Sequence, residues 1–118
     1  MTINFMTNDN IIIDLDFLNK VIGDDQEFAK ELFEIFIDNC LYNISKLQKA
    51  LNDNDKNSWY MASHAMKGSS ASIGAFNFSK LCDLSQKISD QDGPEKFKTL
   101  ENIKADFAKV QDFIKNIK

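Results

Sequence analysis

The sequence contains no arginine: all 14 of its cationic side chains are lysines, against 18 aspartates and glutamates, and the formal net charge is −4. A nucleic-acid-binding protein usually carries a basic patch or stripe, and no run of lysines forms one here. Arginine is also the side chain that clamps a phosphate with two parallel hydrogen bonds. We therefore expect no nucleic-acid partner, and any phosphate held by this protein must depend on lysine or on backbone N–H groups.

Cysteine is scarce as well. Cys40 and Cys82 are the only two, and both lie within apolar helical patterns. Two thiols in a chain of this length do not make a disulfide framework, and a free buried cysteine packs as a small hydrophobic residue. We expect both side chains in the core.

Long apolar runs are absent. No stretch approaches the roughly 18 consecutive apolar residues of a membrane span, and the N-terminus lacks the basic and then apolar pattern of a signal peptide. We therefore expect a cytoplasmic protein without membrane contacts. The length of 118 residues indicates a single domain, which we assign to residues 14–118. Residues 1–13 are expected to form a tail, in which the apolar residues 11–13 either pack on the domain or form a short extended entry.

Apolar residues recur at helical spacing in five segments, and alternation typical of a strand is nowhere long enough to count. A short first helix is expected between Asp14, its N-cap, and Gly23, which ends it. The second helix is predicted to be capped by Asp24 and to run to about residue 51, with an apolar stripe that includes Phe28, Leu32, Ile35 and Phe36. A bend or break is possible at residues 39–40.

The third helix is predicted over residues 55–73. Either Asn54 or Asp55 caps it, and Gly74 ends it in the left-handed conformation. A fourth helix follows to about residue 88. Pro94, at or near the first position, starts the last helix, whose apolar side is expected to contain Phe97, Leu100, Ile103, Phe107, Val110, Ile114 and Ile117. Four substantial helices joined by short turns predict an all-α, antiparallel up-down four-helix bundle with a short additional N-terminal helix.

The only histidine, His64, lies in the third of these helices. At about 100° per residue, the residues that face the core are Trp59, Ala62, Met66, Ser69 and Ile73. His64 is turned roughly 200° from that face, toward solvent, and Lys67 and Gly68 share its side of the helix. Glycine in a helix interior costs about 0.5–1 kcal/mol relative to alanine. At Gly68 this cost suggests close approach by another molecule.

The pattern His-x-x-Lys-Gly-x-Ser-x-x-x-Gly-Ala resembles the signature of histidine phosphotransfer (Hpt) domains, and its places are filled here by His64, Lys67, Gly68, Ser70, Gly74 and Ala75. The similarity extends from roughly residue 15 to residue 87. The resemblance implies a four-helix bundle that passes phosphoryl groups between receiver-domain aspartates through one histidine. It implies a stand-alone phosphocarrier with response-regulator receiver domains, a hybrid histidine kinase, or both as partners. We expect a monomer with no metal or cofactor of its own, and Mg²⁺ in the partner's receiver domain.

Four residues are expected to carry the chemistry. His64 is the nucleophile, which needs a free neutral ring nitrogen, and Gly68 leaves room for the partner. Lys67 supplies electrostatic support, since opposite unit charges about 4 Å apart attract by roughly 4 kcal/mol at an effective dielectric of 20 and by less when exposed. Gln86 is the candidate for orienting the ring, because it follows Gly74 by about as many residues as His64 precedes it. The resemblance supports this role, because some Hpt domains have a Gln or Glu at about this position that bonds to the imidazole. Gln86 could equally be a solvated polar residue.

The remaining predictions concern docking and alternatives. Small or apolar groups around His64 are expected to dock the partner, together with Gly68: Met61, Ala65, Ala71 and Ser72, with Leu15 and Leu18 from the first helix. Ser69 and Ser70 are expected to pack between helices, with Ser69 reaching a backbone carbonyl or, less simply, a phosphate. No glycine-rich phosphate loop indicates a kinase. The alternative is an adaptor that docks receiver domains without accepting phosphate.

Overall fold

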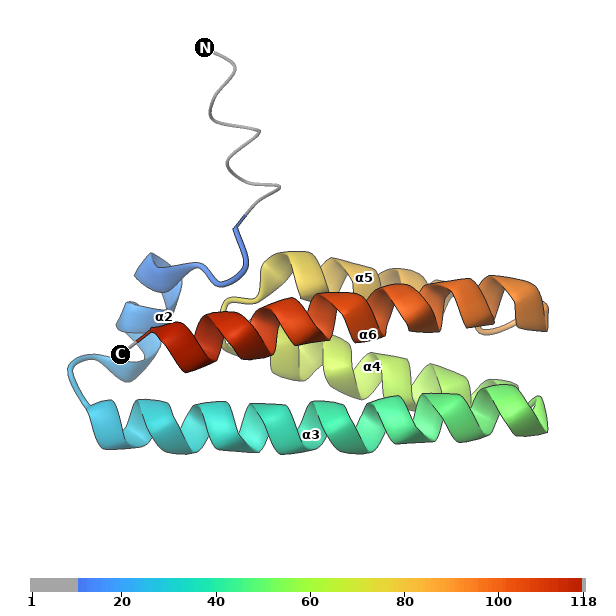
Figure 1. Cartoon of the computed structure of the whole chain (residues 1–118), viewed down its shortest axis with the longest axis horizontal. Helices are drawn as coiled ribbons and strands as arrows, with labels where there is room; N and C mark the ends of the chain where they lie inside the picture. Colours follow the sequence, from blue (N-terminus) through green and yellow to red (C-terminus); the bar gives the residue numbers. More distant parts are fainter. Residues whose placement is uncertain (1–10, 118) are drawn as a thin grey trace, which may run out of the picture.

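The computed structural model describes residues 11–117, in which five helices and no strand occur. They are α2 (Leu15–Ile22), α3 (Gln26–Asp53), α4 (Lys56–Ser72), α5 (Phe76–Lys87) and α6 (Gly93–Asn116). The four longer helices run antiparallel to their neighbours in the chain, and α2 lies at one end of them (Figure 1). Helix α4 packs against α3 and α5, and α6 packs against the same two helices. This confirms the predicted four-helix bundle with a short additional helix. None of these five helices combines the length and hydropathy that a membrane span requires.

Aspartates start the first three of these helices. The side chains of Asp14, Asp25 and Asp55 accept hydrogen bonds from the backbone N–H groups three residues later, at 3.1, 2.9 and 3.0 Å respectively. Each satisfies one of the N–H groups that a helix leaves unpaired at its start. The predicted cap of α3, Asp24, is wrong by one residue: Asp25 has the extended backbone that brings its carboxylate to the next turn. Asn54 instead ends α3 in the left-handed region, at φ 54°.

Helix α3 is continuous through residues 39–40, so the predicted bend or break is absent. The amide of Asn43 donates to both the backbone carbonyl and the side-chain oxygen of Asn39, at 2.9 and 3.2 Å. Ser69 on α4 donates to the same Asn39 side-chain oxygen at 3.1 Å. Asparagine weakens a helix when its side chain competes for the backbone, and here the side chains bond along α3 and across to α4 instead.

The core lies between the four long helices, and its largest fully buried side chains include Trp59, Leu47, Met66, Leu100 and Ile103. Two of the predicted apolar stripes are wrong in part. Phe28 and Ile35 are 41% and 67% exposed, whereas Leu32 and Phe33 pack against the core and Phe36 is buried in it.

The apolar side of α6 also differs from the prediction at its start. Phe97 is 57% exposed, whereas its neighbour Lys96 is only 2% exposed. The Lys96 ammonium lies 5.5 Å from the centroid of the Trp59 ring, so the aliphatic stem covers the indole while the charge meets its π face. Burial lowers the pKa of Lys96.

Gly74 joins α4 to α5 and also holds α2 in place. Its φ of +83° is in the left-handed region, as predicted. A Cβ at this position would lie 3.0 Å from the backbone oxygen of Asp14 and 3.1 Å from the Phe17 ring. The Asp14 N–H donates to the Gly74 carbonyl at 2.9 Å. A glycine is therefore required both by the turn and by the close contact with α2.

The residues just before α2 belong to the packed domain. Ile13 is 3% exposed and lies in the core, and the Asn77 side chain donates to the Ile11 carbonyl at 2.9 Å. Of the two alternatives for residues 11–13, packing on the domain is therefore the one that the structure shows. Residues 1–10 of the predicted tail lie outside the described part of the chain.

Cys40 and Cys82 are fully buried and free, as predicted. Burial raises the pKa of each thiol to about 12. Because the thiolate is the reactive form, neither cysteine should be alkylated by iodoacetamide in the folded protein at pH 8, and both should react in denaturant. Intact mass spectrometry measures this directly. Rapid alkylation of either thiol under native conditions would contradict the packing described here.

Candidate functional site

His64 lies on the solvent side of α4. The opposite side of this helix is buried against the bundle through Trp59, Ala62 and Met66, which are 0–4% exposed. His64 and Gly68 are exposed and Lys67 is partly exposed, with a side-chain exposure of 40%. The predicted orientation of the histidine is therefore confirmed, and the ring is accessible to another molecule.

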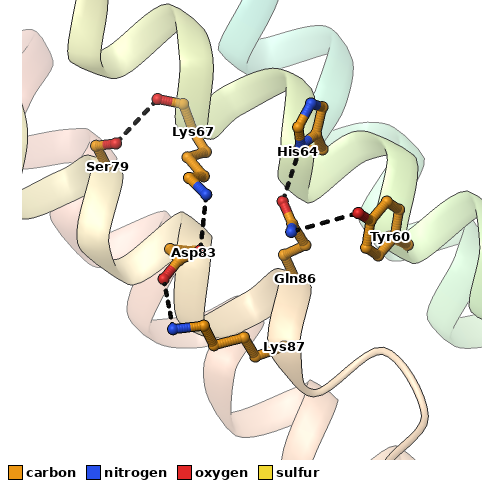
Figure 2. A network of polar contacts seen from close by, with 7 residues as sticks. All are labelled: Tyr60, His64, Lys67, Ser79, Asp83, Gln86 and Lys87. Carbon is orange, nitrogen blue, oxygen red and sulfur yellow. Dashed lines mark hydrogen bonds and ion pairs between the residues drawn. The ribbon is translucent and has the colours of Figure 1, made fainter.

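Polar contacts fix the register between α4 and α5. The Trp59 indole N–H donates to the Ser85 carbonyl at 2.8 Å, and the hydroxyls of Ser63 and Ser85 lie 2.7 Å apart in the core. One turn further along, the Ser79 hydroxyl donates to the Lys67 carbonyl at 2.9 Å (Figure 2). These bonds hold the two antiparallel helices at one relative height. That height places Gln86 opposite His64.

The imidazole is held through one of its two nitrogens. His64 Nδ1 lies 3.0 Å from Gln86 Oε1, and Gln86 Nε2 donates to the Tyr60 hydroxyl at 3.5 Å (Figure 2). An amide oxygen only accepts hydrogen bonds, so in the neutral ring this contact places the proton on Nδ1 and leaves the lone pair on Nε2. The second ring nitrogen lies on the side away from Gln86 (Figure 2). The sequence prediction that Gln86 lies beside the ring agrees with this geometry.

Tyr60 was not identified from the sequence. Its ring is nearly parallel to the imidazole, at 5°, with 6.1 Å between the ring centroids. Its position four residues before His64 puts the two side chains on neighbouring turns of one helix face. This four-residue spacing is the feature of the sequence that could have identified Tyr60 as a neighbour of His64. The tyrosine ring thus lies alongside the imidazole, and its hydroxyl accepts a hydrogen bond from Gln86.

Lys67 has a partner that the sequence analysis did not anticipate. Its Nζ lies 2.9 Å from Asp83 Oδ1 on α5, and the Nζ of Lys87 lies 2.9 Å from Asp83 Oδ2. Hydrogen bonds from Lys67, and then from Lys87, lower the pKa of Asp83 below its usual range. In Figure 2 the Lys67 side chain points toward Asp83 on α5. An acid four residues before a lysine is a recognised helix pair, and this spacing could have indicated Asp83 with Lys87.

Gly68 has no packing role among residues 11–117. A Cβ built at this position meets no atom within 4 Å, and the residue is exposed in the middle of α4. Its backbone does not require glycine, since Gly68 is not among the residues with positive φ. The cost of glycine in this helix is therefore unexplained by contacts within the described chain.

Most of the residues predicted to dock a partner are accessible at the surface of the domain. Met61 is 61% exposed and Leu15 is 43% exposed. Ala65 and Ser72 are also exposed, and Ala71 is partly buried.

Leu18 is a correction to the predicted docking set. It is 3% exposed and belongs to the core, because it is the one side chain that α2 buries against the bundle. Two apolar side chains of α3 outside that set, Ile35 and Tyr42, are 67% and 61% exposed. They lie one turn to either side of Asn39, which bonds to Ser69 on α4.

The two serines next to Gly68 have structural contacts. Ser69 donates to Asn39 and to the Met66 carbonyl, the latter at 3.3 Å, while the buried Ser70 hydroxyl donates to the Met66 carbonyl as well. Both hydroxyls therefore bond to the backbone of α4, and that of Ser69 also links α4 to α3. Within residues 11–117, no three His, Cys, Asp or Glu side chains gather in a way that could hold a metal ion. The site thus presents an oriented, exposed imidazole with a lysine one turn away.

The chain was compared with known proteins. Residues 31–113 match the Hpt domain family. Among solved structures, the crystal structure of histidine-containing phosphotransfer protein B from Pseudomonas aeruginosa PAO1 has a similar fold, with a TM-score of 0.81 and 19% sequence identity over 90% of this chain and 93% of that chain. A search of curated proteins gave no match. Since the family match covers most of the chain, this protein belongs to the Hpt domain family, the histidine phosphotransfer proteins of phosphorelays, which are phosphocarriers and not kinases.

Proposed function

We propose that His64 is the residue of this Hpt domain that accepts and donates the phosphoryl group, and that it does so through Nε2. One observation carries the assignment: the only histidine in the chain lies exposed on α4 with its Nδ1 held by Gln86. A histidine carrier needs an accessible neutral ring nitrogen, and Nε2 meets that need in this tautomer.

The chemistry in this proposal is a displacement at phosphorus. Nε2 attacks the phosphoryl group of a receiver-domain aspartyl phosphate, an N–P bond forms, and the P–O bond to the aspartate breaks so that its carboxylate leaves. The Nδ1 proton stays in its hydrogen bond to Gln86 during the attack. Lys67 lies one turn from His64 and contributes positive charge near the phosphoryl group. Mg²⁺, bound by the receiver domain, would neutralise the charge on the transferring group.

The partner proposed here is a receiver domain, from a response regulator, from a hybrid histidine kinase, or from both in turn. Met61, Ala65, Ala71, Ser72 and Leu15 would contact it, with Ile35 and Tyr42 of α3 at the edge. The contact should be small and transient, because a carrier must release both donor and acceptor. We further infer that the protein acts as a monomer in the cytoplasm. Its two free, buried thiols suit a reducing compartment.

The test is incubation with a panel of receiver domains carrying a labelled aspartyl phosphate. Label should move to this chain, and it should be lost in acid and retained in base, as expected for phosphohistidine. If the chain binds receiver domains but never takes label, it is an adaptor and the proposal is wrong.

Gln86 provides a separate prediction. Gln86→Ala removes the acceptor at Nδ1, so the fraction of ring carrying its proton on Nδ1 should fall and transfer should slow by a few-fold, since one neutral hydrogen bond is worth about 0.5–1.5 kcal/mol. Nitrogen NMR of the single histidine reads the tautomer ratio without ambiguity. An unchanged ratio would show that water replaces the amide and that Gln86 does not orient the ring.

A further inference from the structure

We propose that Asp83 is a positioning residue that competes with the phosphoryl group on His64 for the Lys67 ammonium, and so sets how firmly the carrier retains its phosphate. The proposal rests on the assignment of His64 as the phosphoryl acceptor. In the unphosphorylated protein, Lys67 pairs with Asp83. When His64 is phosphorylated, Lys67 turns toward the phosphoryl group.

The contacts around Asp83 support an exchange of partners. Its two oxygens each accept from a different lysine at 2.9 Å, Lys67 from α4 and Lys87 from its own helix. One carboxylate therefore holds two cations. If Lys67 leaves, Lys87 still neutralises Asp83, so the departure leaves no unpaired carboxylate behind.

The position of Lys67 allows it to move. Its side chain is 40% exposed, and the Asp83 side chain is 27% exposed, so the pair is partly in solvent, where ion pairs are weak. A phosphoryl group carries up to two negative charges and three strong acceptor oxygens. Lys67 lies three residues after His64, on the adjoining turn of the same face. The phosphoryl group is therefore a stronger partner for this ammonium than a carboxylate that already has a second lysine.

The opposite arrangement would be a tether, in which Asp83 holds Lys67 ready for the phosphate. The two arrangements predict opposite changes in the lifetime of phosphohistidine when the Asp83 charge is removed. Under competition, removing the Asp83 charge frees Lys67 and lengthens the lifetime of phosphohistidine. Under tethering, the same change loosens Lys67 and shortens that lifetime. The second lysine on Asp83 favours competition, because a tether needs no further cation.

The experiment uses phosphoramidate, a small-molecule phosphoryl donor, so that no receiver domain contributes. Its P–N bond breaks, the phosphoryl group bonds to His64 Nε2, and ammonia leaves with the electron pair. After removal of the donor, phosphorus NMR follows hydrolysis, in which water attacks phosphorus and the N–P bond electrons return to Nε2. Asp83→Asn should lengthen the phosphohistidine lifetime about two- to fivefold, the range expected for an exposed ion pair.

Control variants separate competition from a general charge effect. Asp83→Glu should restore the original lifetime, and Lys87→Ala should shorten it, since Asp83 then holds Lys67 alone. Asp53→Asn breaks a lysine–aspartate pair of similar length, 2.8 Å, at the end of α3 and changes the net charge equally, so it should have no effect. In a Lys67→Ala background, Asp83→Asn should lose most of its effect.

The outcomes distinguish the two proposals. If neither phosphoramidate nor a phosphorylated receiver domain places a phosphoryl group on His64, the proposed function fails. If His64 is phosphorylated but Asp83→Asn leaves the lifetime of phosphohistidine unchanged or shortens it, only the competition fails. Equal lengthening with and without Lys67 also overturns it, because Asp83 would then act directly on the phosphate.

Discussion

Replacing His64 with glutamine should abolish acceptance of phosphate from every receiver domain that labels the unmodified protein. The chain has no other histidine, and a glutamine amide is not a nucleophile for phosphorus. The side chain is exposed, and its hydrogen bond to Gln86 also lies at the surface, so the free energy of unfolding should change by no more than about 0.5 kcal/mol. Label transfer and thermal unfolding followed by circular dichroism measure the two quantities.

Two results would count against this assignment. Residual label on His64→Gln would show that another residue accepts phosphate, and loss of helical circular dichroism would show that the histidine is structural. Gln86→Ala is the matched comparison, because it breaks the same hydrogen bond from the other side. That variant should still take label, only more slowly.

The bundle could be predicted from the sequence because its signals are local. Apolar spacing, capping residues at or next to the helix starts and the glycines at positions 23 and 74 define helix limits within one turn of chain. The third predicted helix, residues 55–73, differs from α4 by one residue at each end. Neighbouring candidates for the same role could not be separated: Asp24 and Asp25 are equally able to cap, and only the backbone conformation decides.

Packing between helices accounts for the errors in the predicted core. Phe97 is exposed and Lys96 is buried because Trp59 of α4 offers a flat surface that the lysine stem covers. Leu18 is buried because α2 has one side against the bundle. Both outcomes depend on the rotation of one helix relative to another, which periodicity within a single helix does not determine.

In the site, too, local spacing could be predicted from the sequence, whereas contacts between side chains of different helices could not. Gln86 could be placed beside His64 because an antiparallel pair joined by a short turn brings residues at equal distances from the turn to one height. Asp83 and Lys87 were missed because the direction taken by a long lysine side chain depends on its partners on the next helix. The structure adds that Lys67 is already paired, which converts a supposed free cation into one with two possible partners.

Replacing Gly68 with glutamine should slow transfer from a receiver domain on the order of 100-fold, the scale of loss when reacting groups are held about 1 Å out of place. The structure provides the reason: a Cβ at Gly68 meets nothing within 4 Å in the described chain, so the glycine leaves space for something outside it. The longer side chain would stand one turn from His64, where the partner must approach. In isolation the variant should be equally stable or more stable by about 0.5 kcal/mol, because glutamine forms helix more readily than glycine.

Gly93→Gln is the matched control for this prediction. Gly93 is also helical and exposed and its Cβ position is equally open, but it begins α6 and not the helix that carries His64. This control should transfer at the original rate. The affinity for an unphosphorylated receiver domain, measured by calorimetry, should fall for Gly68→Gln alone. Slow transfer with unchanged affinity would refute the explanation by clearance, and a clear loss of stability would show that Gly68 is needed within the bundle; only reduced affinity in a stable domain fits a glycine that is there for the partner.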